Sequence, residues 1–197
     1  MAPLVNTDVA AQTAFYVLLG VFGASEWSIR IRSGLNRGGT RIDRGSFYVV
    51  IATSVLGVGA AFGFAGGVHG AGITTARWPI FIVGLVVMAL GIALRQWSVL
   101  VLGQFFTVQV HVHEGQTVVD TGPYRYVRHP SYSAIVMTFV GMGIALENWL
   151  SLATLLVVPT IGLVVRIRVE ERALTDALGE PYREFSASRA RLIPRVW

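Results

Sequence analysis

The sequence predicts an all-α integral membrane protein with about five transmembrane helices. Its 197 residues are 53% hydrophobic and only 14% charged, whereas about a quarter of the residues of soluble domains are charged. The mean hydropathy of +0.60 supports the same class. A helix needs about 20 mainly apolar residues to cross a bilayer. Five stretches reach or approach this length: Ala11–Ile31, Phe47–Gly66, Trp78–Leu102, Ser131–Leu146 and Trp149–Arg168.

The first three stretches form an N-terminal group within residues 1–102. Ala11–Ile31 is too long, and too poor in positive charge before it, to be a cleaved signal peptide. The glycine-rich segment "GGVHGAG" separates the second stretch from the third and is typical of a flexible turn. We therefore expect three helices that span the membrane in this part of the chain.

The last two stretches predict a tight antiparallel hairpin, because only "ENW" lies between them. Ser131–Leu146 is short for a full span, so its neighbours must extend it or thin the bilayer. Pro159 in the middle of the last stretch predicts a kink there.

The arginines predict the orientation in the membrane. Arg32, Arg37, Arg41 and Arg44 crowd one loop, whereas the first ten residues and the segment "GGVHGAGITTA" contain none. Basic loops stay in the cytoplasm, so we expect the N-terminus outside and the C-terminus inside. All 16 basic residues are arginine and 22 residues are glycine, which indicates a GC-rich genome and a bacterial inner (plasma) membrane.

Composition also excludes several kinds of chemistry. The chain has no cysteine, which excludes disulfides, thiolate catalysis and cysteine–metal sites. It has no lysine, which excludes a Schiff-base mechanism. The net charge of +5 does not indicate nucleic acid as a partner, because the arginines flank apolar segments instead of forming a basic stripe. We expect membrane lipids as partners and no metal, and the sequence leaves monomer and oligomer open.

The segment between residues 103 and 122 is polar enough to leave the membrane. Its stretch "TVQVHVHEGQTVV" alternates polar and apolar residues like a β-strand. Because we expect no sheet for it to join, we predict an extended cytoplasmic loop that both of its ends hold near the membrane.

One motif concentrates polar and aromatic chemistry at the entrance of the fourth helix: "GPYRYVRHPSY", Gly122–Tyr132. Pro130 suits the first turn of a helix, where its missing N–H costs nothing. His129 before it is then extended and places its imidazole at the helix entrance. Taken singly, interfacial tyrosines and arginines usually serve as membrane anchors. Their concentration in one loop favours a functional site.

A second motif, "RIRVEERALTDALGEPYREF", continues the last helix beyond its apolar part. Arg166 and Glu170 are four residues apart and share one helical face, while Arg168 and Glu171 could pair. An ionisable group such as Arg166 at the membrane boundary usually has a function. The short hairpin brings the end of the last helix beside the start of the fourth. The two motifs are therefore expected to form one site that faces the cytosol.

Together the two motifs, followed by "RLIP", resemble the isoprenylcysteine carboxyl methyltransferase family and its phospholipid N-methyltransferase relatives. The resemblance covers about Gly103–Pro194 and implies S-adenosyl-L-methionine as methyl donor. It implies one integrated domain, in which residues 103–197 form the methyltransferase region and residues 1–102 a three-helix scaffold. The implied cofactor pocket faces the cytosol and has a lateral opening for a lipid-like acceptor.

The resemblance also implies roles for single residues. Arg166 and Glu170 would face the reacting centre as catalytic residues. The residues expected at the cofactor come from both motifs and the preceding loop: His113, Val118, Tyr124, Tyr126, Arg128, His129, Pro130, Tyr132 and Glu171.

The expected reaction is O-methylation of the carboxylate of an isoprenoid or lipid-like acceptor, which needs no general base. Phospholipid N-methylation or thiol S-methylation are alternatives, and an amine would need Glu170 or His129 as a base. A membrane reductase with a nicotinamide cofactor is a weaker alternative, because such proteins are usually longer. An alternative of another class is a non-catalytic membrane subunit or transporter. In that case charged residues four apart, such as Glu26 and Arg30, would be structural pairs.

Overall fold

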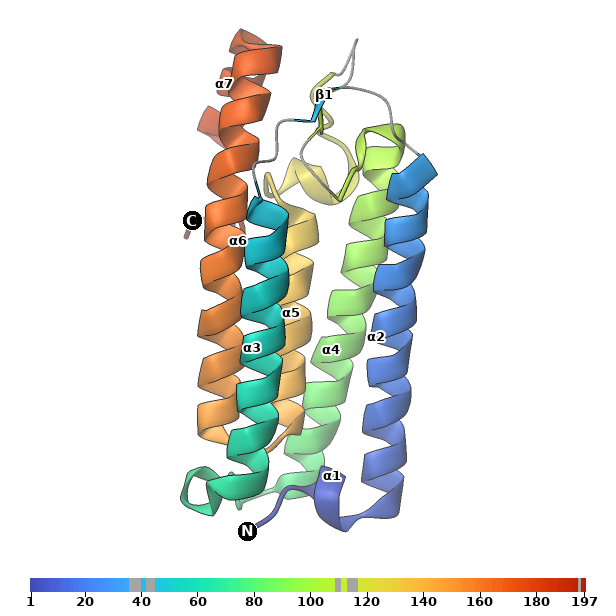
Figure 1. Ribbon diagram of the computed structural model, residues 1–197, viewed down its shortest axis with the longest axis vertical. Helices are drawn as coiled ribbons and strands as arrows, with labels where there is room; N and C mark the ends of the chain where they lie inside the picture. Colours follow the sequence, from blue (N-terminus) through green and yellow to red (C-terminus); the bar gives the residue numbers. More distant parts are fainter. Residues whose placement is uncertain (36–39, 42–44, 109–110, 113–116, 195) are drawn as a thin grey trace.

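The protein is an elongated bundle of α-helices, seen here in a computed structural model (Figure 1). The structure describes residues 1–35, 40–41, 45–108, 111–112, 117–194 and 196–197. The helices are α1 Leu4–Thr7, α2 Val9–Leu35, α3 Ser46–Gly67, α4 Arg77–Leu102, α5 Pro130–Ala145, α6 Trp149–Leu178 and α7 Glu180–Ser188. Short 3₁₀ turns follow α3 at His69–Ala71 and α4 at Gly103–Phe105, and a third covers Gly122–Arg125.

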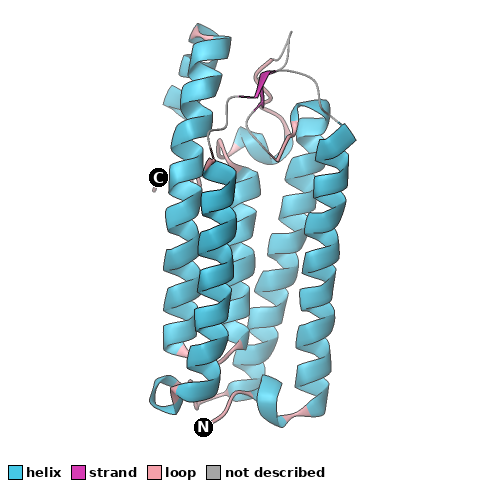
Figure 2. Ribbon diagram, viewed as in Figure 1, coloured by secondary structure: helices cyan, strands magenta, loops and turns pink. Residues whose placement is uncertain are grey.

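The all-α membrane class is confirmed, since helices make up most of the described chain (Figure 2). Within the described residues, four helices are long and apolar enough to cross a membrane: α2, α3, α4 and α6. The fourth predicted helix, α5, has 16 residues and is shorter than a full span, as its sequence indicates. The four longer helices therefore determine the length of the bundle along its axis.

Two features differ from the sequence predictions or extend them. His111–Val112 forms a two-residue strand, β2, that pairs antiparallel with β1 at Thr40–Arg41, so the expectation of an unpaired loop is wrong at these residues. The helix α6 continues through Pro159, whose ring lies against Gly57 of α3. The kink expected at this proline stays a prediction.

The packing of α4 on α5 depends on small residues. A Cβ atom at Gly84 would come within 2.8 Å of the Cα atom of Ala145, and one at Gly91 within 2.7 Å of the backbone nitrogen of Thr138. Glycine thus allows the two backbones to approach closely, as in other membrane helix pairs. These contacts hold the middle and the end of α5 against α4.

The predicted hairpin is present, because only three residues separate α5 from α6. Asn148 caps α6 by accepting hydrogen bonds from the backbone nitrogens of Leu150 and Ser151 at 3.0 and 3.1 Å. The helix α6 has 30 residues, which corresponds to about 45 Å at 1.5 Å per residue. It is longer than the hydrocarbon core, so its last turns extend beyond the membrane beside the start of α5.

Candidate active site

The first motif folds as its proline predicts. Pro130 is the first residue of α5, and His129 occupies the cap position with non-helical backbone angles. The backbone nitrogen of His129 donates to the carbonyl oxygen of Arg191 at 3.0 Å, and that of Arg128 donates to Ala190 at 2.9 Å. The C-terminal segment after α7 therefore holds the loop before α5 in place.

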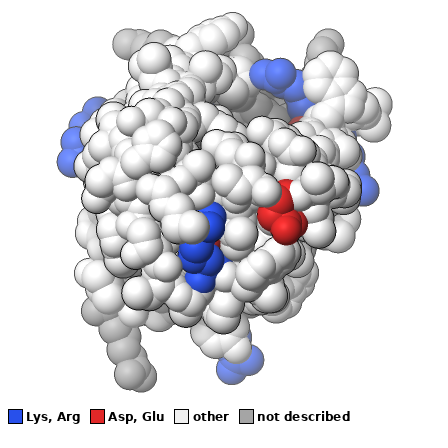
Figure 3. All heavy atoms as spheres, turned by 90° about the horizontal axis from the view of Figure 1, so that it is seen from below, with Lys and Arg blue, Asp and Glu red and all other residues white. Residues whose placement is uncertain are grey.

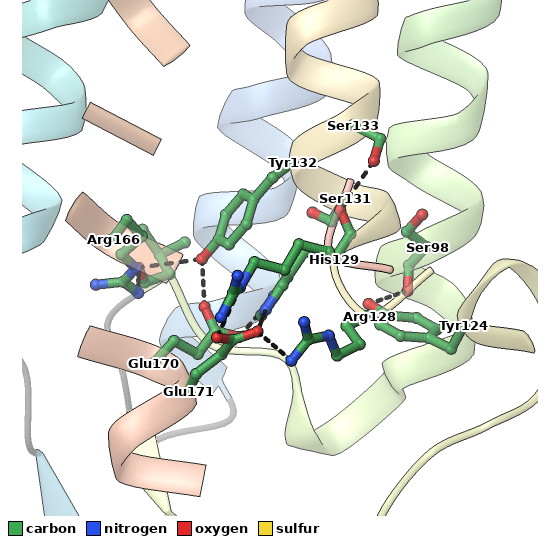
Figure 4. Close-up of polar contacts among 12 residues, drawn as sticks. Ser98, Tyr124, Arg128, His129, Ser131, Tyr132, Ser133, Arg166, Glu170 and Glu171 are labelled. Atoms are coloured by element: carbon green, nitrogen blue, oxygen red, sulfur yellow. Dashed lines mark hydrogen bonds and ion pairs between the residues drawn. The ribbon is translucent and has the colours of Figure 1, made fainter. Parts of the chain in front are cut away.

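His129 and Glu171 form the centre of a charged cluster (Figure 4). The ring nitrogen Nε2 of His129 lies 3.3 Å from Oε1 of Glu171. The same carboxylate contacts Nη1 of Arg128 at 2.8 Å and Nε of Arg191 at 3.0 Å. Glu171 thus pairs with cations from the α5 entrance and the C-terminal segment. The pair of Arg168 with Glu171 considered above is not formed, since Arg168 lies in a groove on another face of α6.

Tyr132 connects the other two predicted catalytic residues. Its hydroxyl donates to Oε2 of Glu170 at 2.5 Å and accepts from Nε of Arg166 at 3.2 Å (Figure 4). Its ring stacks on the His129 imidazole, with centroids 5.6 Å apart and planes at 22°. The shared face of Arg166 and Glu170 on α6 therefore points at the start of α5, where the two motifs meet.

Arg166 is buried, with 3% of its surface exposed. Its guanidinium donates to the hydroxyl of Ser46 at 3.0 Å and to the carbonyl oxygen of Val108 at 2.7 Å. These partners lie at the start of α3 and in the segment after α4. Three parts of the chain thus fix the position of this side chain.

The remaining predicted residues lie in different surroundings. Tyr124 is buried, and its hydroxyl donates to the carbonyl oxygen of Ser98 at 3.3 Å. Burial raises the pKa of Tyr124, and the nearby negative charge of Glu170 raises it further, so the phenol stays protonated. Tyr126 is exposed, and neither it nor the half-buried Val118 lines the cavity described below. His113 lies outside the described residues.

A cavity of about 720 Å³ extends from this cluster into the bundle. Its polar end is lined by His129, Tyr132, Arg166 and Glu170. Its other walls are mainly apolar side chains of α2, α3 and α5: Leu19, Phe22, Val50, Val55, Phe139 and Met142. The shape combines a few polar groups with a large apolar volume, which is typical of a site for a small lipophilic molecule.

Two charged residues at this site, Arg95 and Arg191, had no role in the sequence analysis. Arg95 of α4 binds both carboxylate oxygens of Glu26 of α2, at 2.8 and 3.1 Å, and also donates to the hydroxyl of Ser131. Arg191 binds Glu171. The pairing of Glu26 with Arg30 suggested by their spacing is wrong, because the carboxylate turns to α4 instead. No local pattern reveals partners that lie 69 and 20 residues apart.

Two buried polar atoms of this region have no hydrogen-bond partner among the described residues, Nε of Arg128 and the hydroxyl of Tyr182. Burial raises the pKa of Tyr182, and the charges of Glu171 and Glu170 add to the effect. A buried polar atom without a partner is costly. Arg128 also lines the cavity, whereas Tyr182 does not. Within the described ranges, no group of three or more acidic or histidine side chains could hold a metal ion.

The central part of the chain is similar to a known family of proteins. Residues 82–176 match the model of the Isoprenylcysteine carboxyl methyltransferase (ICMT) family. A "Probable protein-S-isoprenylcysteine O-methyltransferase" of Oryza sativa subsp. indica is 32% identical over 111 residues, which are 55% of this chain and 58% of the relative. "Protein-S-isoprenylcysteine O-methyltransferase A" of Arabidopsis thaliana is 31% identical over 122 residues, or 61% and 62% of the two chains.

The name of a further relative indicates a smaller substrate. "Methanethiol S-methyltransferase 1" of Bradyrhizobium diazoefficiens is 35% identical over 71 residues, which are 36% of this chain and 24% of the relative. The matched part of this chain spans about three fifths of the length of the plant relatives. The matched segment contains α5 and the charged turns of α6, and in this segment the chain is similar to the isoprenylcysteine carboxyl methyltransferase family, as its two motifs predict.

Proposed function

We propose that the protein is an S-adenosyl-L-methionine-dependent membrane methyltransferase that O-methylates the carboxylate of an isoprenoid or lipid-like acceptor. The observation that carries this proposal is the joining of Tyr132, Glu170 and Arg166 at the polar end of an apolar cavity. Residues 103–197 supply these groups, while residues 1–102 add scaffold and cavity walls. The reacting centre contains Arg166 and Glu170 in this proposal.

The residues present fit the proposed cofactor, which supplies an electrophilic methyl group on a sulfonium ion. Carboxylates and aromatic faces attract such a cation, and Glu170, Glu171 and Tyr132 offer both. The carboxylate of the cofactor suits a guanidinium and the free N–H groups at a helix start. Arg128, whose Nε atom has no partner among the described residues, provides the guanidinium, and it lies beside the positive end of α5. His129, Pro130, Tyr124 and Tyr182 complete the proposed pocket.

An acceptor with a long apolar chain suits the remaining cavity. Its walls on α2 and α3 are mainly apolar, while Arg166 stands at the polar end. Methyl transfer to a carboxylate is an in-line displacement, so the protein mainly has to position the donor and the acceptor. Arg166 is fixed by Ser46, Val108 and Tyr132, which suits it to orient a carboxylate.

Thiol S-methylation is the second candidate, and the relative from Bradyrhizobium diazoefficiens favours it. A cavity of about 720 Å³ is large for an acceptor as small as methanethiol, so we rank the carboxylate first. Phospholipid N-methylation would require His129 or Glu170 as a base. A non-catalytic subunit or transporter remains the alternative of another class, and it would not bind the cofactor saturably.

The proposed orientation places this site in the cytoplasm of a bacterial cell. The end of the bundle that carries α1 presents a largely uncharged surface (Figure 3). Arg125, Arg128, Arg189 and Arg191 lie at the opposite end, with the start of α5 and the last turns of α6. Basic residues near the ends of membrane helices favour the cytoplasmic side.

The test is a transfer assay with purified protein in detergent. Radiolabelled S-adenosyl-L-methionine is offered with a panel of lipophilic acids, amines and thiols. Label that base releases from a lipophilic acid identifies a methyl ester and supports the proposal. Base-stable label on a thiol would instead support S-methylation, and base-stable label on an amine would support N-methylation. Absence of both saturable cofactor binding and transfer would refute it.

A further inference from the structure

The two helices that form the lateral walls of the cavity pack on different partners. The helix α2 lies against α4, and α3 lies against α6 (Figure 1). Both helices contribute side chains to the cavity, among them Trp27 and Arg30 of α2 and Phe47 and Val55 of α3. The apolar part of the cavity therefore lies between two walls that belong to separate helix pairs.

Arg30 and Phe47 contact one another across these walls. The Cζ atom of Arg30 lies 5.3 Å from the centre of the Phe47 ring, a cation–π distance. Phe47 is the second residue of α3, and Arg30 lies near the end of α2, so the contact is at the same end of the bundle as the candidate site.

No carboxylate of the described part of the chain neutralises the charge of Arg30. Glu26 lies one turn before it, but both oxygens of Glu26 bind Arg95. Among the residues that the structure describes, no acidic side chain forms an ion pair with Arg30. By contrast, Arg128 in the same cavity lining contacts Glu171. A cation that lines an apolar cavity at the membrane boundary favours an anionic ligand group.

Arg30 also lies close to the proposed reacting centre. Ser46 accepts a hydrogen bond from Nη1 of Arg166 at 3.0 Å, and the next residue, Phe47, contacts Arg30. At the start of α3, Ser46 therefore contacts the guanidinium of Arg166, and Phe47 contacts that of Arg30. Arg30 belongs to the N-terminal part of the chain, outside the segment 82–176 that matches the family model.

We propose that Arg30 binds the carboxylate of a single-chain lipophilic acid while the chain of this acid occupies the apolar space between α2 and α3. The inference rests on the proposed function, because the acid is the methyl acceptor. Arg30 then acts as a specificity-determining residue: it selects an anionic head group before the reaction.

The same charge helps the product to leave. Methylation forms a bond between a carboxylate oxygen and the methyl carbon as the bond from this carbon to sulfur breaks. The acceptor changes from an anion into a neutral ester, and the sulfonium becomes a neutral thioether. Since an ester carries no charge for Arg30 to attract, the protein binds the acid more tightly than its methyl ester.

The test measures saturable binding of radiolabelled hexadecanoic acid to the protein in phosphatidylcholine nanodiscs, at about pH 9 so that the acid is ionised. Unlabelled methyl hexadecanoate is the competitor. We expect the wild-type protein to prefer the acid to the ester by about tenfold, which is typical of one added charge-assisted contact. Arg30→Gln is expected to abolish this preference without weakening ester binding, and Arg30→Lys to retain most of it.

Arg32→Gln is the matched control, because it removes the same charge from the same helix at a position that does not line the cavity. An unchanged preference in Arg30→Gln, or an equal loss in Arg32→Gln, would overturn the inference. Displacement of the acid by phosphatidylglycerol in the nanodiscs would also overturn it, since the site would then be one for membrane phospholipid. Binding of S-adenosyl-L-methionine is measured in parallel, and its absence would refute the proposed function instead.

Discussion

The hydroxyl of Tyr132 lies 2.5 Å from Oε2 of Glu170, although 38 residues separate them in the chain. The tyrosine comes from the first turn of α5 and the carboxylate from the part of α6 beyond the apolar stretch. Their hydrogen bond links the two motifs directly. It also orients Glu170, because the same hydroxyl accepts from Arg166 at 3.2 Å.

Removal of this hydroxyl is expected to slow methyl transfer. In Tyr132→Phe the carboxylate of Glu170 loses a donor and Arg166 loses an acceptor, while the ring still stacks on His129. A hydrogen bond to a charged group is typically worth about 1.5–3 kcal/mol, which corresponds to a loss of about 10- to 100-fold in kcat. The kcat of the variant and of the wild type is measured by radiolabel transfer at saturating cofactor.

Tyr16→Phe is the control, because Tyr16 is an exposed phenol of α2. If Tyr132→Phe transferred methyl groups at the wild-type rate, the assignment of Glu170 to the reacting centre would be wrong. A Glu170→Gln variant is expected to lose more activity than Tyr132→Phe, since it removes the charge as well.

The C-terminal segment gives a second prediction. Arg191 binds Glu171 at 3.0 Å, and its carbonyl oxygen accepts from the backbone of His129. We expect Arg191→Gln to raise the KM for S-adenosyl-L-methionine about tenfold with a smaller change in kcat, because Glu171 would lose one of its two arginine partners. Arg191→Lys is expected to recover part of this loss.

The control for Arg191 is Arg183→Gln. Arg183 pairs with Glu180 at 3.2 Å, but both side chains are largely exposed, and such pairs contribute little. Equal effects of the two substitutions on KM would show that Arg191 acts only through the net charge of the segment. A purely structural role would lower thermal stability and leave KM unchanged.

The sequence predicts the helices and the meeting of the motifs well, for physical reasons. Runs of apolar residues reveal helices that cross a membrane, and the three residues between α5 and α6 force an antiparallel pair. Pro130 at the start of α5 fixes where His129 stands. Each of these features depends on local chemistry that one segment of chain carries by itself.

Long-range partners could not be predicted in this way. The spacing of Glu26 and Arg30 suggests a pair within α2, yet Glu26 binds Arg95 of α4. The choice depends on how two helices lie against each other, which one helix does not encode. For the same reason the contribution of Arg191 to the site, and of α2 and α3 to the cavity, emerges only from the folded chain.

Tyr182 provides a prediction about pH. Burial raises its pKa above the ordinary value of about 10, and the charges of Glu171 and Glu170 raise it further. A raised pKa means that the folded protein holds this proton more strongly than the unfolded chain. The stability that Tyr182 contributes is therefore fully present below pH 10 or so and is lost as the pH rises above that value.

Tyr182→Phe removes this titration. We expect its melting temperature to fall less steeply than that of the wild type between about pH 10 and pH 11.5. At neutral pH the variant should be at least as stable as the wild type, because the buried hydroxyl has no partner among the described residues. Identical slopes for the two proteins would contradict the prediction. Weaker cofactor binding by the variant at neutral pH would indicate that the hydroxyl contacts the ligand.

The opposite end of the bundle gives a prediction about stability alone. Glu147, in the turn between α5 and α6, is buried and binds Nη2 of Arg77 at 3.1 Å. Its Oε2 atom also accepts from the backbone nitrogen of Leu4 at 2.5 Å, and its carbonyl oxygen accepts from Ile73 at 2.7 Å. One carboxylate thus joins the N-terminus, the start of α4 and the hairpin.

Glu147→Gln keeps the size of this side chain but leaves Arg77 without its counter-charge. Breaking a buried pair on one side typically costs about 3–5 kcal/mol, so we expect a clear fall in the melting temperature of the detergent-solubilised protein. Glu180→Gln, which breaks the exposed pair with Arg183, should shift it far less. The site lies at the other end of the bundle, so cofactor affinity below the melting temperature should not change. A loss of affinity without a loss of stability would show that the hairpin turn couples to the site.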